Sequence, residues 1–250
     1  EIKISDLSIF AVVWALSFII MNISYFSCAL IYKGKTQNLM ASGLPCGNTG
    51  YFGIPIAFAL FDSTLFGVYL LASISSTMFQ ITVSYYILAL GQFDWKEAVK
   101  KLLSLPPLYG AVIGLFLTFV NIPLPDMVSQ TVDTMKGAFT VLGMMIIGLT
   151  LSGFQQIKLD VKFLTLAMLI RFMIWPALTF AVIALDRVFF GGVLEPLVPI
   201  LMLFSVLPIG ADFAIYAANM NMYPQRAATA VLISTVVAAF VIPLAYTLWG

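Results

Sequence analysis

Histidine is absent from this sequence, and charged residues make up only 9% of it. Without imidazole the chain lacks the usual general base and proton relay, which argues against a hydrolase of the Ser-His kind. Cysteine occurs only as Cys28 and Cys46, both in apolar runs, so we interpret them as packing residues and predict no metal site and no cofactor. No GxxxxGK[ST] phosphate loop occurs and the basic residues are scattered, which argues against ATP hydrolysis and nucleic-acid binding.

Apolar residues fill the chain instead. They account for 62% of its 250 residues, and the mean hydropathy is +1.05, whereas a soluble domain carries about 25% charged residues. The charges separate apolar runs of about twenty residues, the length that crosses a hydrocarbon core of about 30 Å. The sequence therefore predicts an all-α polytopic membrane protein.

The apolar runs divide into eight expected spans. These are Leu7–Ile31, Leu39–Phe61, Leu65–Leu90, Leu105–Val120, Ala138–Leu151, Phe163–Leu185, Leu197–Met220 and Ala227–Leu248. Lysine and arginine gather after the first, third, fifth and seventh spans, so the positive-inside rule places those connections in the cytoplasm and both chain ends outside. The connection after the third span, GQFDWKEAVKK, fits either a short basic amphipathic helix on the inner surface or a solvated loop.

One stretch, Gly43–Ile56, is too rich in glycine and proline to form an unbroken membrane helix. At membrane depth such a segment is tolerated only where it is buried in protein or lines a cavity. A second Pro/Gly interruption, Leu207–Asp212, follows five spans later. Two interrupted segments in corresponding positions indicate an inverted-repeat transporter fold with two crossing broken helices, eight spans being visible of an expected ten. We take Pro55 and Pro208 as the two crossover positions, and we expect the first repeat to lack two N-terminal helices.

Two ionisable residues, Arg171 and Asp212, lie well inside spans. Arg171 falls about 13 Å beyond the start of its span, close to the midplane. Arg171 would attract an anionic substrate, and Asp212 would titrate or coordinate a coupling cation. Alternatively the two pair with each other, or Asp212 caps the half-helix that follows Gly210.

Asn48 and Thr49 are the polar pair of the first interruption. Their side chains either cap freed backbone groups or contact substrate, beside half-helix N-termini whose dipoles suit a carboxylate. The third span adds a polar ladder that either joins helices or lines a pathway: Ser73, Ser75, Ser76, Thr77, Gln80 and Thr82.

Three segments resemble the auxin efflux carrier family, which includes bacterial malate/malonate-type carriers and, more distantly, plant PIN carriers. They are GNTGYFGIPIAFALF, RFMIWPALTF and LPIGADFAIYAANMNMYPQRAATAVLISTVVAAFVIPLAY. The resemblance implies ten helices in two inverted five-helix repeats, related in fold to the bile acid/sodium symporters. It implies core helices at 1–90 and 161–250, scaffold helices at 105–152 and a cytoplasmic connection at 91–104.

We therefore expect a secondary transporter of small organic anions, a dicarboxylate or an auxin-like carboxylate, working by elevator-type alternating access. Asn48, Thr49, Gly50, Arg171 and Gly210 would bind substrate, with H⁺ or Na⁺ as coupling ion. A homodimer is plausible from the resemblance, and the plasma membrane, in bacteria the inner membrane, is the expected location. The alternatives are a ligand sensor or scaffold with the same fold, or a sodium-coupled symporter of the bile-acid type; an enzyme is not expected.

Overall fold

The computed structural model describes residues 4–120, 125–131, 134–135, 138, 141–142, 145 and 159–249. Four helices in this part of the chain are long and apolar enough to cross a membrane: Ser8–Ala29, Ser63–Leu90, Val161–Phe189 and Pro224–Thr247. They confirm the helical membrane class and coincide with the first, third, sixth and eighth expected spans. The total of eight spans and the inverted repeat stay predictions.

Two of these long helices contain a π-helical turn. The second is built from α4 (Ser63–Phe79), η2 (Gln80–Ser84) and α5 (Tyr85–Leu90), and the third from α9 (Val161–Leu169), η3 (Ile170–Ile174) and α10 (Trp175–Phe189). The first and fourth are α1 (Ile4–Ala29) and α13 (Pro224–Trp249). Since π-turns insert an extra residue into the ladder, they shift the side chains that follow and often occur at functional sites.

Shorter helices occupy the second and seventh expected spans. The second is divided into α2 (Lys35–Gly43), then η1 (Thr49–Gly53) with α3 (Ile54–Leu60). The seventh is divided into η4 (Glu195–Leu197) with α11 (Val198–Val206), then α12 (Ala211–Asn219). Each span is therefore two half-helices joined by a few non-helical residues.

The connection after the third span folds as α6 (Trp95–Leu103), and α7 (Pro106–Phe119) follows it. A helix therefore replaces the solvated loop that the sequence left open. Only a few residues of the fifth expected span, Ala138–Leu151, belong to the described part of the chain, so that span lies largely outside it.

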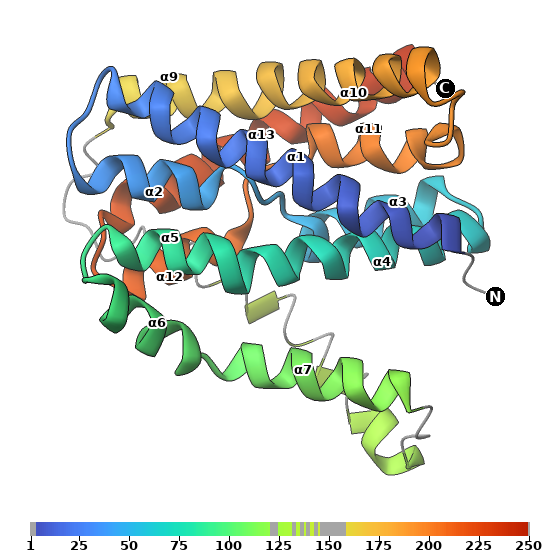
Figure 1. Cartoon of the computed structure of the whole chain (residues 1–250), viewed down its shortest axis with the longest axis horizontal. Coiled ribbons are helices and arrows are strands. Elements are labelled where there is room, and N and C mark those ends of the chain that lie inside the picture. The colour runs from blue at the N-terminus through green and yellow to red at the C-terminus, as the bar shows by residue number, and fades with distance from the viewer. Residues whose placement is uncertain are drawn as a thin grey trace.

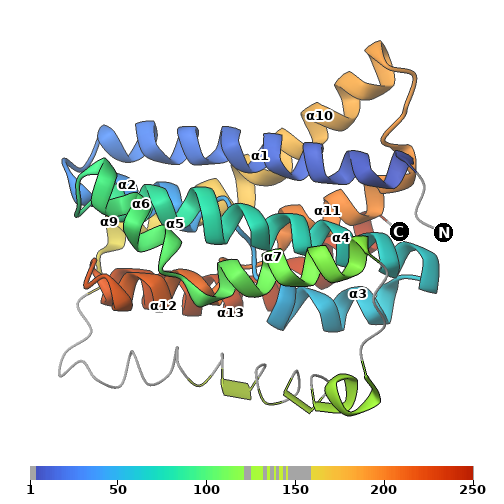
Figure 2. The ribbon, with the colours of Figure 1, turned by 60° about the horizontal axis from the view of Figure 1, so that its bottom comes forward.

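The long helices run roughly along one axis, with α2 and α11 among them and α12 packed beside α13 (Figures 1 and 2). In both views α1 begins and α13 ends at the same end of the bundle. The interior is densely packed there, because every residue of α11 from Ile200 to Val206 is buried. The non-helical residues 44–48 and 207–210 of the two interrupted segments are also buried or half-buried, as irregular backbone at membrane depth requires.

Candidate functional site

The non-helical residues of the two interrupted spans pair with each other. We call residues 44–48 and 207–210 the crossing. Gly47 and Ile209 form an isolated antiparallel bridge. The backbone N–H of Asn48 donates to the Pro208 carbonyl at 2.8 Å, and the backbone N–H of Gly210 donates to the Cys46 carbonyl at 3.1 Å. These bonds satisfy several of the backbone groups that neither half-helix uses.

The sequence placed the first crossover at Pro55, and the structure moves it to the residues around Pro45. Pro55 lies inside the continuous helix Thr49–Leu60, directly after η1, so its missing N–H accompanies a π-helical turn and not a break in the chain. Pro208 lies in the crossing itself, where its carbonyl accepts the Asn48 amide. A proline motif alone does not tell a break in the chain from a π-helical turn within a helix, because both positions lack the regular i→i−4 hydrogen bond.

Arg171 forms hydrogen bonds with the C-terminal ends of α2 and α11, the two half-helices that lead into the crossing. Its Nε donates to the Leu207 carbonyl at 2.5 Å, one terminal nitrogen donates to the Phe204 carbonyl at 2.9 Å, and the other makes a longer 3.5 Å contact with the Leu44 carbonyl. The Trp175 indole also donates to Leu44, at 3.0 Å. The last carbonyls of a helix lack partners and carry partial negative charge, so a buried guanidinium satisfies and neutralises them together.

This arrangement leaves no ion pair between Arg171 and Asp212 among the described residues. The side chain of Arg171 is only 1% exposed. A Cβ on Gly47 would lie 2.5 Å from a guanidinium nitrogen. Glycine at this position therefore lets the backbone rest against the arginine.

Asn48 stands at the start of η1 with its side chain 3% exposed. Its Oδ1 accepts the amides of Tyr51 at 3.1 Å and Phe52 at 3.2 Å, which is a helix N-cap. Its Nδ2 has no hydrogen-bond partner among the described residues. A buried amide donor without a partner is costly, so it calls for an explanation such as a ligand. The capping interpretation is thus correct for the oxygen and leaves the nitrogen free.

Thr49 is tied to α4 rather than left free. Its hydroxyl accepts from Ser73 at 3.0 Å, and its carbonyl accepts from the Tyr69 hydroxyl at 2.8 Å. Gly50 next to it is exposed, and a Cβ there would meet open space. Gly50 thus borders a free volume, whereas Thr49 helps to hold η1 in place.

Asp212 lies in the first turn of α12, immediately after the crossing, and is half-buried. No hydrogen bond or ion pair joins its carboxylate to another described residue. α12 has no side-chain N-cap bond, so Asp212 does not cap it but its charge suits the helix N-terminus. Arg171 and Asp212 are therefore stabilised by opposite helix ends.

The polar ladder of the third span divides by role. Thr77 and Thr82 donate to carbonyls of their own helix, Ser75 makes a long bond to α1, and the Ser76 carbonyl faces the Cys46 thiol. Gln80 is different, because its Nε2 lies 3.1 Å from the place of a Cβ on Gly210. The glycine thus permits close approach of an amide from η2 to the crossing.

The three π-helical turns in the described part of the chain each deliver a polar residue to this region: Thr49 from η1, Gln80 from η2 and Arg171 from η3. The sequence singled out these three, but it missed the residues that support them. Tyr69, Trp175 and Ser234, whose hydroxyl accepts the Ile209 amide at 3.0 Å, contact backbone far away in the chain. Nothing local in the sequence marks such partners.

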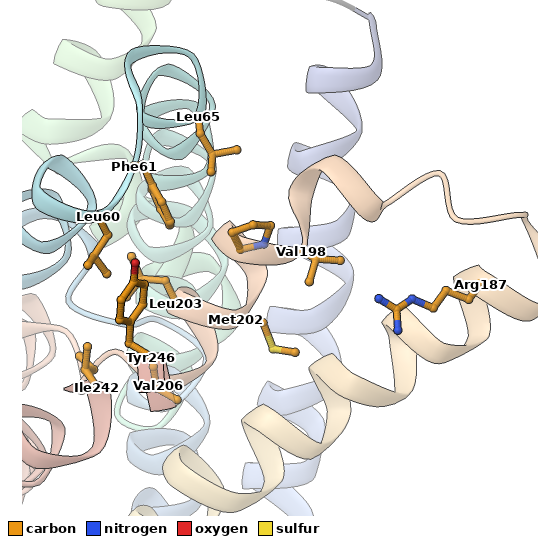
Figure 3. Close-up of a pocket in the computed structure, with 11 residues that line it drawn as sticks. Leu60, Phe61, Leu65, Arg187, Val198, Met202, Leu203, Val206, Ile242 and Tyr246 are labelled. Atoms are coloured by element: carbon orange, nitrogen blue, oxygen red, sulfur yellow. The ribbon is translucent and has the colours of Figure 1, made fainter. Parts of the chain in front are cut away.

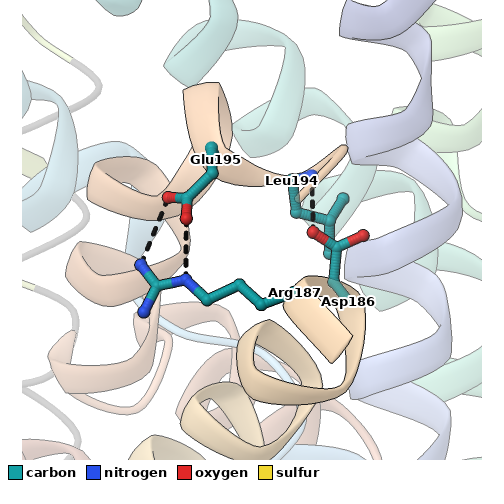
Figure 4. A network of polar contacts seen from close by, with 4 residues as sticks. All are labelled: Asp186, Arg187, Leu194 and Glu195. Carbon is teal, nitrogen blue, oxygen red and sulfur yellow. Dashed lines mark hydrogen bonds and ion pairs between the residues drawn. The ribbon is translucent and has the colours of Figure 1, made fainter. Parts of the chain in front are cut away.

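A separate apolar cavity of about 480 Å³ lies between α3, α4, α10, α11 and α13 (Figure 3). Its lining is mainly aliphatic and aromatic, and the residues of the crossing do not line it. Its one charged residue, Arg187, forms a bidentate pair with Glu195 at 2.7 and 3.2 Å (Figure 4). Beside this pair the Asp186 carboxylate accepts the Leu194 amide at 2.8 Å. The cavity therefore offers no unpaired charge to an organic anion.

Apolar helices with two interruptions that meet at a buried polar crossing are typical of membrane transporters, and comparison with known proteins agrees. Residues 93–246 match the profile of the family described as "Membrane transport protein". The chain belongs to this family, the auxin efflux carrier family. It is also 25% identical over 138 residues to an uncharacterized transporter of Methanocaldococcus jannaschii, an alignment that covers 54% of this chain and 44% of that protein. The chain thus spans less than half the length of this relative.

Proposed function

We propose that this protein is a secondary transporter that carries small organic anions, a dicarboxylate or an auxin-like carboxylate, through the crossing. The observation that carries the proposal is the buried Nδ2 of Asn48, a donor with no partner among the described residues. A carboxylate oxygen is the acceptor that this donor lacks, and the hydrogen bond to a charged oxygen is roughly twice as strong as one between neutral groups.

The helix ends support the same substrate class. η1 and α12 both begin at the crossing, so the positive ends of two dipoles lie near Asn48. Arg171 adds positive charge, although its side chain is buried and bonded to carbonyls. In our proposal the anion contacts the side-chain amide of Asn48, the exposed Gly50 backbone and the α12 N-terminus, while Arg171 holds the half-helices in place.

Asp212 is the proposed coupling group. An ionised carboxylate next to the substrate would repel an anion, whereas a protonated one would not, so binding of the anion and of a proton favour each other. Na⁺ in place of the proton is the alternative. If the coupling ion is a proton, the substitution Asp212→Asn should remove the pH dependence of uptake. A sodium requirement that persists in the wild type at every pH would instead favour Na⁺ as the coupling ion.

Movement is proposed to follow the elevator scheme, in which core helices 1–90 and 161–250 slide against scaffold helices 105–152. The Arg171 and Trp175 contacts, together with the crossing bonds, join the two interrupted spans to α9–α10. Elements connected in this way suit motion as one body.

Counterflow in proteoliposomes tests the proposal. Vesicles loaded with an unlabelled dicarboxylate should accumulate the labelled compound transiently, because a carrier exchanges the two. Empty vesicles and vesicles without protein are the controls. Binding of the labelled compound to the purified protein without any exchange would instead identify a sensor or scaffold.

A further inference from the structure

Helix α6 has one apolar and one basic face. At about 100° per residue, its apolar side chains fall on one continuous arc, and its charged side chains fill the opposite one. The apolar arc consists of Trp95, Ala98, Val99, Leu102 and Leu103, and the charged arc of Lys96, Glu97, Lys100 and Lys101. This division is typical of a helix that rests on a boundary between apolar and aqueous surroundings.

Only part of the apolar arc packs against the protein. Ala98 is buried and Leu102 is half-buried, whereas Trp95 is 62%, Val99 36% and Leu103 54% exposed. These three residues follow one another at a spacing of four, so they form a single stripe along the helix. We call Trp95, Val99 and Leu103 the α6 stripe.

Helix α6 lies next to the end of a candidate membrane span. It follows directly on α5, the end of the candidate span Ser63–Leu90, and leads into the apolar α7. Asp94 caps it by accepting the Glu97 amide at 2.8 Å, and it runs across from α5 to α7 at one end of the bundle (Figure 1). The α6 stripe therefore lies on a capped helix between α5 and α7, next to the end of a candidate membrane span, and not at a free loop tip.

Basic residues border the stripe. On the wheel Lys96 and Lys100 follow directly after Leu103, and the Lys96 ammonium lies 5.5 Å from the Trp95 ring centroid. Lys101 lies on the far side of the charged arc, with its ammonium 5.3 Å from the Phe93 ring. Three lysines against one glutamate give this helix the charge that complements an anionic surface.

We propose that α6 is an interfacial helix that binds the anionic bilayer surface. The α6 stripe enters the boundary between headgroups and acyl chains, and Lys96 and Lys100 contact anionic headgroups. Aromatic side chains such as Trp95 favour this depth. Since α6 joins the two helices around it, the lipid charge would set how firmly this connection is held.

Site-directed spin labelling of the full chain tests the proposal. A nitroxide is placed at Val99→Cys in the stripe or, as the matched control, at Glu97→Cys on the charged arc. The protein is reconstituted in phosphatidylcholine alone or in an equimolar mixture with phosphatidylglycerol. Collision with oxygen, which concentrates in the bilayer, is compared with collision with a water-soluble nickel chelate. The unsubstituted chain, whose two cysteines are buried, is the labelling blank.

In the mixed bilayer the label at position 99 should favour oxygen and the label at position 97 should favour nickel. The double substitution Lys96→Gln with Lys100→Gln should increase collision of the label at position 99 with nickel. The ratio of membrane-bound to unbound α6 should fall about fivefold for each lysine removed. Lys33→Gln with Lys35→Gln, which removes equal charge from another connection, should not. Equal nickel access at both positions would overturn the proposal, and so would the same burial of position 99 in both bilayers. A stripe shielded from both reagents would mean that protein covers it, which also contradicts a lipid partner.

Discussion

Arg171 performs a structural task that its place in the sequence does not announce. A charge near the middle of a membrane suggests contact with substrate, but its guanidinium bonds the carbonyls at the ends of α2 and α11. Its planar fork spreads donors over three nitrogens that reach both helix ends, whereas lysine has all its donors on one nitrogen. The positive charge still contributes to the field at the crossing.

Arg171→Lys should therefore destabilise the fold more than it changes the substrate preference. We expect a loss on the order of 2 kcal/mol, since one or more buried carbonyls lose their partner. Thermal unfolding of the purified protein measures it. Arg187→Lys, in the exposed pair with Glu195, is the control and should leave the unfolding temperature nearly unchanged. Wild-type stability of Arg171→Lys together with lost anion binding would mean that Arg171 serves the substrate.

Gly47 and Gly50 form a matched pair for a second prediction. A Cβ at Gly47 would lie 2.5 Å from the Arg171 guanidinium, whereas one at Gly50 would meet nothing within 4 Å. Gly47→Ala should thus lower the free energy of unfolding by about 1–3 kcal/mol through overpacking, and Gly50→Ala should alter it much less. Thermal unfolding of both variants side by side measures the difference; equal stabilities would contradict the close packing on Arg171.

At the scale of elements, hydropathy predicted the long helices well because a membrane helix needs only an apolar run of sufficient length. It predicted the interrupted spans less well. The Gly/Pro-rich stretch was identified, but Pro55 was taken for the break in place of the residues around Pro45, since both prolines fit their local backbone. The partners Trp175 and Tyr69 could not be predicted, because they meet the crossing only through the packing of distant helices.

A polar junction holds α1, α2, α9 and α13 together at one end. The Asp160 carboxylate accepts from the Tyr32 hydroxyl and from the Phe163 amide and pairs with Arg226 at 2.8 Å. Arg226 also donates to the Thr36 hydroxyl at 3.0 Å. Burial favours the neutral acid, but these hydrogen bonds and the nearby guanidinium outweigh it and hold the pKa of Asp160 below its usual value.

This junction predicts a loss of stability in acid. Because the pKa of Asp160 is lower in the folded state, its contribution is complete above the unfolded value of about 3.9 and disappears as the pH falls through the folded one. Asp160→Asn should cost on the order of 1 kcal/mol at neutral pH and should flatten this acid dependence. Thermal unfolding at a series of pH values measures both effects. An equal acid slope in Asp160→Asn and wild type would exclude this carboxylate as the cause.

At the scale of the whole molecule, the fold brings the two distant interruptions together. It places a positive side chain at the helix ends that carry negative partial charge, and an amide and a carboxylate at the helix starts that carry positive partial charge. The ends of α2 and α11 are neutralised by Arg171, and the starts of η1 and α12 lie beside Asn48 and Asp212. The alternative in which Arg171 pairs with Asp212 is not found among the described residues, and each charge is matched to a helix dipole instead. Under our proposal this leaves one donor-rich region for an anion and one carboxylate for a proton.

The most direct test is the concentration dependence of dicarboxylate counterflow in Asn48→Ser. Serine keeps a capping oxygen for η1 and removes the free amide donor. The account predicts an intact fold and a half-saturating concentration raised about tenfold or more, the value of one hydrogen bond to a charged group. Asn22→Ser, where the amide bonds only its own helix at 2.8 Å, should retain the wild-type value. Unchanged half-saturation and rate in Asn48→Ser would show that the crossing is structural and that the anion binds elsewhere.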